Sequence, residues 1–169
     1  MSLVWMRGLA VTAMLGAATT LAGCERLLDI ERAQAAIKSG LTEQLQMPFA
    51  SVTCPESRAM KAGDVFMCTA VAETGGDLRI QVTQTDGSGA INWKVTNGDK
   101  VLSLTKLEAQ IKEGLVRQLN VDAAVACGGK MRVAKAGQTL ECTATAGAES
   151  RKVLVTMDDD KGNVTWVVK

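Results

Sequence analysis

The sequence predicts an α+β protein made of two tandem modules, each with one helix packed on a four-stranded antiparallel sheet and closed by one disulfide. Three observations support this prediction. The chain repeats itself at an offset of about 74 residues, each copy begins with helical spacing of apolar residues, and each copy continues with a two-residue alternation. We expect a signal peptide over residues 1–23, the first module over 24–98 and the second over 99–169.

The repeat covers nearly all of both copies. IKSGLTEQL at 37–45 corresponds to IKEGLVRQL at 111–119, and KAGDVFMCTA at 61–70 corresponds to KAGQTLECTA at 135–144, both at an offset of 74. VTQTDGSGAINWKV at 82–95 corresponds to VTMDDDKGNVTWVV at 155–168 at an offset of 73. Because only single-residue gaps interrupt the match, the sequence is a duplicated module of roughly 70 residues.

Each copy opens with an apolar stripe at three- and four-residue steps, which predicts an amphipathic helix. The stripes are Ile30, Ala33, Ile37, Leu41 and Leu45 in the first copy, and Leu104, Leu107, Ile111, Leu115 and Leu119 in the second. Pro48 predicts that the first helix ends near Gln46 or Met47. Thr105 and Glu108 predict a capping box at the start of the second helix.

A two-residue period follows each helix and predicts strands with one buried face. The expected inward residues are Phe66, Cys68, Ala70 and Ala72 in the first copy, and Leu140, Cys142, Ala144 and Ala146 in the second. Their small alanines leave room for a helix on that face. Further apolar strands lie at 80–82, 91–95, 153–155 and 164–168, with turn sequences TDGSG and DDDKG before the last strand of each copy. We therefore expect one helix followed by four antiparallel strands in each module.

The first 24 residues are typical of a lipoprotein secretion signal. Cationic Arg7 precedes sixteen uncharged residues at 8–23, a stretch too short to span a bilayer, which takes about 20 residues. LAGC at 21–24 resembles the lipobox of bacterial lipoproteins. This resemblance implies that the signal is cut before Cys24, that its sulfur carries a diacylglyceryl group and that its new amine is acylated, which would anchor the chain firmly. A plain secretory signal with an incidental cysteine is the alternative.

The location of the anchor follows from the residue after the cysteine. Glu25 stands where many Gram-negative lipoproteins carry the aspartate that retains them in the inner membrane. We therefore expect the outer membrane if the host has one, and otherwise the outer face of the cytoplasmic membrane. Met6 is a second candidate for the initiator besides Met1, because Arg7 directly follows it.

Lipidation of Cys24 would leave four of the five cysteines, an even number that predicts two disulfides in an oxidising compartment. Four cysteines allow three connectivities. The duplication favours Cys54–Cys68 and Cys127–Cys142, because each ancestral module had to be complete by itself. A cross-module pairing would require a later exchange. The sequence contains no C-x-x-C motif, so we expect structural rather than redox-active disulfides.

The two copies resemble a domain-of-unknown-function family of small secreted bacterial domains that is frequent in actinobacterial lipoproteins. The resemblance rests on a helix followed by VTCP at 52–55, AGDVFMC at 62–68 and a VT…D..G strand pair. The second copy departs from it with Cys127-Gly128 where the family often has Cys-Pro. The resemblance implies an envelope lipoprotein with one disulfide per domain, and it brings no catalytic residues and no activity.

Composition argues against several function classes. Removal of the signal takes away one of 19 cationic side chains and none of the 18 acidic ones, so the mature chain has zero formal net charge. This balance argues against nucleic-acid binding and against electrostatic adhesion to anionic lipid. Histidine is absent, which removes the most common general base and metal ligand. We therefore expect no catalytic site, no cofactor and no metal.

Three remaining motifs have a structural interpretation. MDDDKGN at 157–163 resembles a calcium loop, but glycine at 162 and asparagine at 163 do not fit an EF-hand, so we expect a hairpin turn. Trp93 and Trp166 could stack on a sugar, but their repeat-matched positions between core residues indicate a packing role. The serines have no histidine partner, and there is no nucleophile elbow.

One difference between the copies indicates a partner surface. Val65, Met67 and Val71 lie on the outer face of the expected sheet, and exposed apolar patches tend to mark contacts. The second copy carries Thr139, Glu141 and Thr145 at the matching positions. The alternative is that the second module, or a twist of the strand, covers the three apolar residues.

These observations predict a lipid-anchored cell-envelope protein that acts as a non-catalytic binding or adaptor module, one form of which would be an inhibitor of a secreted enzyme. Its expected partners are the membrane, through the anchor, and an envelope protein. A structural or assembly factor of an envelope complex is the alternative. An enzyme is the third class, and it would need a nucleophile or metal site that the sequence does not offer.

Overall fold

The structure, a computed structural model, describes residues 26–169; Cys24 therefore lies outside the described residues. The first module contains α1 (Ile30–Leu45), β1 (Phe49–Thr53), β2 (Val65–Ala72), β3 (Asp77–Gln84) and β4 (Ile91–Val95). The second contains α2 (Leu104–Leu119), β6 (Ala124–Ala126), β8 (Thr139–Ala146), β9 (Glu149–Met157) and β10 (Val164–Val168). Between the modules lie the short 3-10 helix η1 (Gly98–Lys100) and strands β5 (Val101–Ser103) and β7 (Met131–Val133).

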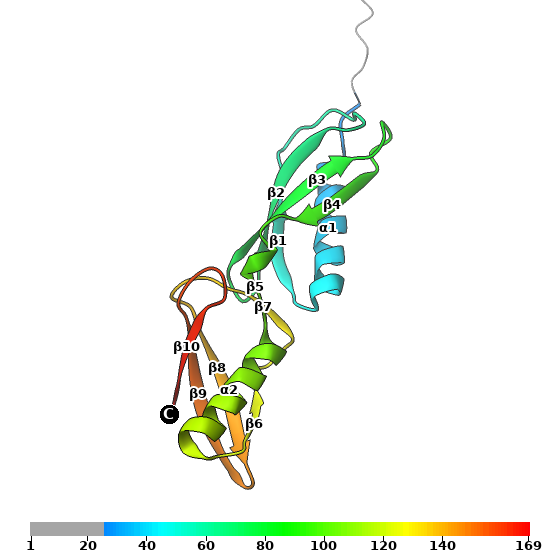
Figure 1. Cartoon of the computed structure of the whole chain (residues 1–169). Coiled ribbons are helices and arrows are strands. Elements are labelled where there is room, and N and C mark those ends of the chain that lie inside the picture. Colours follow the sequence, from blue (N-terminus) through cyan, green and yellow to red (C-terminus); the bar gives the residue numbers. More distant parts are fainter. Residues whose placement is uncertain (1–25) are drawn as a thin grey trace, which may run out of the picture.

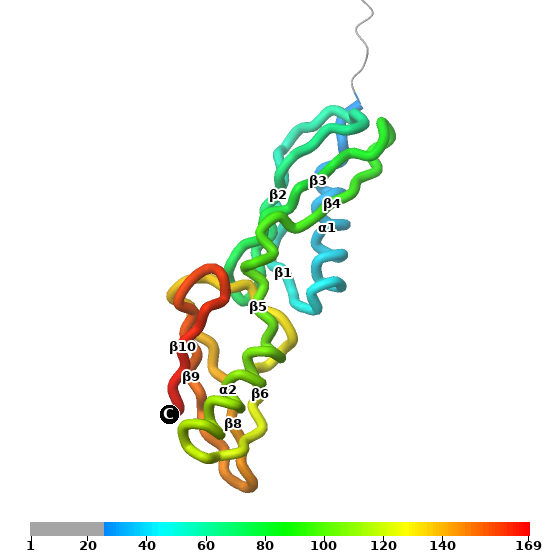
Figure 2. Tube along the Cα trace, in the orientation of Figure 1, coloured from blue at the N-terminus to red at the C-terminus, as the bar shows by residue number. Residues whose placement is uncertain are grey.

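The fold is α+β with antiparallel sheets, as predicted, and the two modules lie end to end (Figures 1 and 2). The four-stranded sheet of the first module has the order β1-β2-β3-β4, and that of the second has the order β10-β9-β8-β6. One helix packs beside each sheet (Figure 1). A third sheet, formed by β5 and β7 alone, lies at the junction.

Each helix ends with a residue in the left-handed conformation. The first helix ends at Leu45, with Gln46 at φ 50°, close to the predicted end. The second ends at Leu119, with Asn120 at φ 53°.

The capping-box prediction for the second helix is wrong. The helix begins at Leu104, two residues earlier than the box requires, and Ser103 is the N-cap whose side chain accepts a hydrogen bond from the Lys106 amide. Glu108 instead accepts the amide of Cys127 at 2.7 Å.

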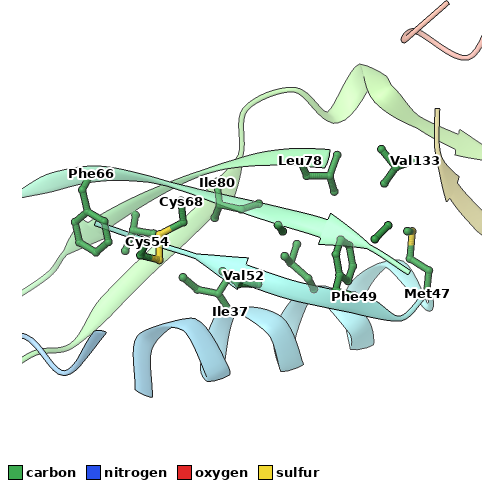
Figure 3. Packing of buried hydrophobic residues seen from close by; sticks show 14 of the residues in the cluster. Ile37, Met47, Phe49, Val52, Cys54, Phe66, Cys68, Leu78, Ile80 and Val133 are labelled. Carbon is green, nitrogen blue, oxygen red and sulfur yellow. A yellow bond between two sulfur atoms is a disulfide. The ribbon is translucent and has the colours of Figure 1, made fainter. Parts of the chain in front are cut away.

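Alternation along β2 separates a buried face from an exposed face without exception. Phe66, Cys68, Ala70 and Ala72 are buried and pack with residues of the helix such as Ile37. The same pattern in β8 buries Cys142 and Ala144, while Leu140 and Ala146 are half-buried. Figure 3 shows how the side chains of the first sheet and helix meet in one layer.

A tryptophan on the last strand of each sheet lies against a glycine of the helix. A Cβ atom added to Gly40 would lie 2.7 Å from Cζ2 of Trp93, and Gly114 stands in the same relation to Trp166. Glycine at these positions lets the helix approach the ring closely. Both tryptophans therefore have the packing role that the repeat predicted.

Each disulfide closes one module. Cys54, directly after β1, is bonded to Cys68 in β2, and Cys127, directly after β6, is bonded to Cys142 in β8. These are the pairs that the duplication favours. A helix side chain also fixes each first cysteine, since the Cys54 amide donates to Oε1 of Gln34 at 3.1 Å, as the Cys127 amide does to Glu108.

The junction was not predicted. Val133, at the end of β7, is fully buried and belongs to the core of the first module, although it follows the expected boundary at residues 98/99 by more than 30 positions. Figure 3 shows it beside Leu78 at one end of that core. A Cβ atom on Gly76 would lie 2.7 Å from Cγ1 of Val133, and Gly76 has φ +83°. Only glycine satisfies both the close approach and the backbone conformation.

Polar contacts surround the packing of Val133 on Gly76 at the junction of the two modules. The Lys100 ammonium lies 3.0 Å from a carboxylate oxygen of Asp160 in the second module and 3.9 Å from one of Asp77 in the first. Arg132 donates to the Thr74 carbonyl at 3.3 Å. The two modules are therefore joined by side chains from both sides as well as by the chain itself.

The junction sheet is part of the repeat. The isolated bridge Leu27–Ala59 in the first module lies at the positions of the Val101–Val133 pair, 74 residues earlier. The sequence comparison did not reveal this strand pair because it is three residues long in one copy and a single bridge in the other.

We expect Val133→Ala to destabilise the first module, although the residue belongs to the second. Loss of two buried methyl groups at about 0.8 kcal/mol each, together with the cavity left behind, should lower the free energy of unfolding by about 1–3 kcal/mol. Urea unfolding followed by Trp93 fluorescence, in a chain with Trp166→Phe, would measure the change. Val121→Ala, at a residue 38% exposed, is the control and should have a smaller effect. An unchanged midpoint for Val133→Ala would contradict a shared core.

Non-reducing peptide mapping of the protein should give Cys54 linked to Cys68, and Cys127 linked to Cys142. Cys68→Ala should then lower stability by about 2–5 kcal/mol, the range for removing a native disulfide from a small secreted domain. A peptide joining Cys54 to Cys127 would contradict the closed-module structure.

Candidate functional site

The outer face of β2 carries the three apolar residues that the sequence singled out. The exposed fractions are 47% for Val65, 46% for Met67 and 38% for Val71. The second module does not cover them, and the alternation of β2 directs them away from the core. We call these three residues the outer-sheet patch.

Polar residues frame the outer-sheet patch. Met67 faces Gln81 across the β2–β3 ladder, and Val65 faces Thr83. Exposed Thr69 separates Met67 from Val71 along the strand. Val65 and Met67 are therefore neighbours on the outer face of β2, and the patch is bordered by polar residues rather than continuous with the core.

An ion pair occupies the corresponding place in the second module. Glu141, the counterpart of Met67, lies 2.7 Å from the ammonium of Lys152 on the neighbouring strand. Lys152 is the counterpart of Arg79, which is exposed and makes no ion pair with any residue in 26–169. The first module thus has an apolar side chain and a free cation where the second has a closed pair.

A partly buried polar cluster lies at the N-terminal end of the first module. The Arg58 guanidinium donates two bonds to Oδ2 of Asp64, at 2.7 and 3.0 Å, and Gln84 donates to the same oxygen at 3.1 Å. Gln84 is fully buried and also accepts from the Lys61 amide. Hydrogen bonding from Arg58 is the main cause that lowers the pKa of Asp64, against the opposing effect of burial.

The second module lacks this cluster, because two of its three residues are replaced. Gln138 and Met157 stand at the positions of Asp64 and Gln84, and Arg132 stands at the position of Arg58. Without the carboxylate, the guanidinium of Arg132 donates to the carbonyls of Thr74 and Thr139. The cluster positions the 58–64 segment, and its second copy helps to hold the junction. The inward position of Gln84 in the β3 alternation was the sequence signal for it.

The acidic turn between β9 and β10 is a hydrogen-bonded hairpin. Asp159 accepts from the amides of Lys161 and Asn163, which lowers its pKa together with the bond from the Asn163 side chain. Asp158 accepts from the Thr165 hydroxyl, and Asp160 accepts from the Ala136 amide. The three carboxylates therefore accept hydrogen bonds from other groups of the protein and stabilise the turn. Among the described residues, no group of three or more His, Cys, Asp or Glu side chains could hold a metal ion.

The predicted lipidation site cannot be placed, because Cys24 lies outside residues 26–169. Within these residues, neither helix is long and apolar enough to cross a membrane. The first bridge, at Leu27, begins three residues after Cys24, and α1 begins at Ile30. An anchor at Cys24 would therefore have almost no stalk.

The chain belongs to the family described as Domain of unknown function (DUF4333), whose model matches it twice, over residues 12–89 and 87–162. Each match covers most of one copy of the repeat, although the second begins at residue 87, ahead of β4 of the first module. The two tandem matches support the resemblance drawn from the cysteine motifs. No curated protein and no solved structure was found to match the chain.

Asp64→Asn should make the first module less sensitive to acid. Because the pKa of Asp64 is lowered in the folded state, the unfolded chain takes up a proton first as the pH falls below the ordinary value of 3.8. The stability that Asp64 contributes is thus present at neutral pH and is lost as the pH falls toward its folded pKa. Urea midpoints measured at pH 6 and in the acid range should converge for the wild type and the variant as the pH falls. A constant difference at all pH values would contradict this role.

Proposed function

We propose that this protein is a lipid-anchored cell-envelope adaptor that binds a partner protein with the outer-sheet patch of its first module. The observation that carries the proposal is the exposure of Val65, Met67 and Val71 on a face that the same fold keeps polar in its second copy. The fold therefore does not require apolar residues there. Exposed apolar groups of this kind tend to mark contact surfaces.

The charges beside the patch specify the partner further. Arg79 is exposed on β3, next to the patch, and Lys94 is exposed on β4, one strand further. The carboxylate that neutralises the counterpart of Arg79 has been replaced by Met67. A partner with an apolar centre and an acidic rim would complement this surface. Interfaces commonly have such an apolar centre and a polar rim.

The lipobox supports attachment to an envelope membrane through Cys24. With only Glu25 and Arg26 between the cysteine and the first bridge, the first module would lie near the lipid headgroups. An adaptor held there would meet envelope proteins and secreted enzymes, and inhibition of a secreted enzyme is one form that its binding could take. We expect the outer membrane if the host has one, and otherwise the outer face of the cytoplasmic membrane.

A structural or assembly role is the second candidate. The junction favours it, because Val133 and the contacts of Lys100 and Arg132 join the modules into one elongated body (Figure 1). Such a body could hold a partner at a fixed distance from the membrane. The two candidates differ in whether the protein captured from solubilised envelope is a secreted enzyme or a membrane complex.

Met67→Glu, which copies Glu141, should weaken partner capture without unfolding the protein. The new carboxylate can pair with Arg79, so the free energy of unfolding should stay within about 0.5 kcal/mol of wild type. In the complex the same carboxylate would be buried against an apolar surface, which is costly. Capture from detergent-solubilised envelope, with thermal unfolding in parallel, would measure both effects.

Thr143→Glu is the matched control, since it adds the same charge to the outer face of the second module at an exposed position. It should leave capture intact. Undiminished capture by the Met67→Glu protein would reject the outer-sheet patch as the binding surface.

Metabolic labelling with an alkyne fatty acid should tag the protein, and Cys24→Ala should abolish the tag and release the chain from the membrane fraction. Two or three acyl chains give stable anchoring, whereas a single one is marginal, so the release should be nearly complete. A Cys24→Ala protein that still carries the label would show that the anchor lies elsewhere.

A further inference from the structure

The far end of the second module contains an open groove of about 410 Å³. Its walls are largely apolar and include Leu119 at the end of α2, Val121 just after that helix, Ala123 before β6 and Ala144 in β8. Leu119 is 56% exposed and Val121 38% exposed. The volume lies in the range of about 300–1,000 Å³ that is typical of ligand sites.

The first module fills the same space with its own side chains. Eight of the ten residues that line the groove have counterparts in or beside the core of the first module. Of the other two, Glu149 corresponds to the buried Gly76 and Lys169 to the exposed Thr96. The largest differences are Met47, Phe49 and Leu78 in the first module against Val121, Ala123 and Arg151 in the second. The three first-module residues are at most 4% exposed. The groove is therefore a part of the core that the second module leaves empty.

The first module also shows what this end of the fold can accept. Its core is completed by Val133, which β7 brings to it from outside the module. An apolar side chain on an extended segment thus already docks at this end once within the molecule. In the second module, Glu149 replaces Gly76 and Arg151 replaces Leu78, so the rim of the groove differs.

The charges on this rim disfavour a second copy of the chain as the occupant. Arg151 and Lys169 line the groove with one acid, Glu149, whose carboxylate lies 3.8 Å from Arg151. The edge that docks on the first module carries Lys100 and Arg132 and would meet like charge here. The rim instead complements an acidic segment.

We propose that this groove binds an extended segment of a partner protein, which places one large apolar side chain over Ala123 and a carboxylate beside Arg151 and Lys169. The apolar side chain would occupy the volume that Phe49 and Leu78 fill in the first module. The groove is lined from the end of α2, β8 and the start of β9, elements of the module that lies at the end of the molecule away from α1 (Figure 1). It depends neither on the outer-sheet patch nor on lipidation. If the groove does not bind such a segment, the proposed function of the outer-sheet patch is unaffected. If the outer-sheet patch does not bind a partner, the proposal for the groove is unaffected.

The docking segment of the chain itself provides the probe. A peptide of residues 129–135 carrying Val133→Phe, Lys130→Glu, Arg132→Glu and Lys135→Glu supplies the large apolar side chain and the negative charge. Titration of the ¹⁵N-labelled mature chain in detergent micelles should shift amide resonances around the groove. A peptide with Val133→Phe alone keeps its basic residues and should bind about fivefold more weakly, which corresponds to an ion pair of about 1 kcal/mol.

Two variants of the protein test the site itself. Ala123→Phe, copied from Phe49, should fill the groove, raise the melting temperature by a few degrees as cavity-filling changes commonly do, and abolish binding. Leu119→Glu, at an exposed wall, should weaken binding about tenfold or more while the chain stays folded. Val116→Glu is the control, since Val116 is 42% exposed on the same helix outside this groove.

Three results would overturn the proposal. They are an absence of shifts at the groove with the acidic peptide, equal binding to wild type and to a folded Ala123→Phe protein, and equal or tighter binding of the basic peptide. Dodecanoate is the competing ligand, because it also combines an apolar chain with a carboxylate. If dodecanoate binds in the groove and the acidic peptide does not, the site takes an amphiphile and the protein-segment proposal is wrong.

Discussion

Val133 connects the two halves of this protein because it lies in the sequence of one module and in the core of the other. Its full burial against Gly76 depends on a glycine whose backbone conformation and missing Cβ atom are both required. The polar contacts of Lys100 and Arg132 lie around this buried apolar contact. Small domains of this size bury only about 60% of their unfolded surface and are marginal alone. The joint therefore stabilises the first module as well as orienting the second.

The two copies keep the same interior and differ at their surfaces. Both pack a tryptophan on a helix glycine, both bond a helix side chain to the amide of the first cysteine, and both close with a disulfide. They differ on the outer sheet face, where Met67 replaces the ion-paired Glu141, and at the far end, where Ala123 replaces Phe49. A duplicated fold permits this comparison, because a residue type that occurs in only one copy is not required by the fold itself. Both proposed binding surfaces are inferred from such differences.

Much of the fold could be predicted from the sequence, because duplication supplies two readings of each pattern. The helical stripes, the inward face of β2 and the disulfide pairs all follow from spacing that occurs twice. The junction could not be predicted in this way. A three-residue strand has too short an alternation to detect, and burial of Val133 depends on a neighbour far away in the sequence. The capping box failed for a similar reason, because the β5–β7 pair leads directly into a helix that begins at Leu104, two residues earlier than the box requires.

The outer-sheet patch was visible in the sequence as a departure from the polar pattern of the second copy, whereas the groove was not. Ala123 and Arg151 are unremarkable as residue types, and only the packed end of the first module shows the volume that they leave unfilled. Sites of this kind require the structure because they are defined by space rather than by a motif. The family match adds that the domain occurs twice, but no activity.

Residual dipolar couplings of the protein, measured for amides in both modules, test the central claim most directly. If Val133 joins the modules into one body, a single alignment tensor should fit the couplings of the first and second sheets together, in the relative orientation of Figure 1. Separate tensors of different magnitude for the two modules would show that they move independently, and would contradict a core shared through Val133.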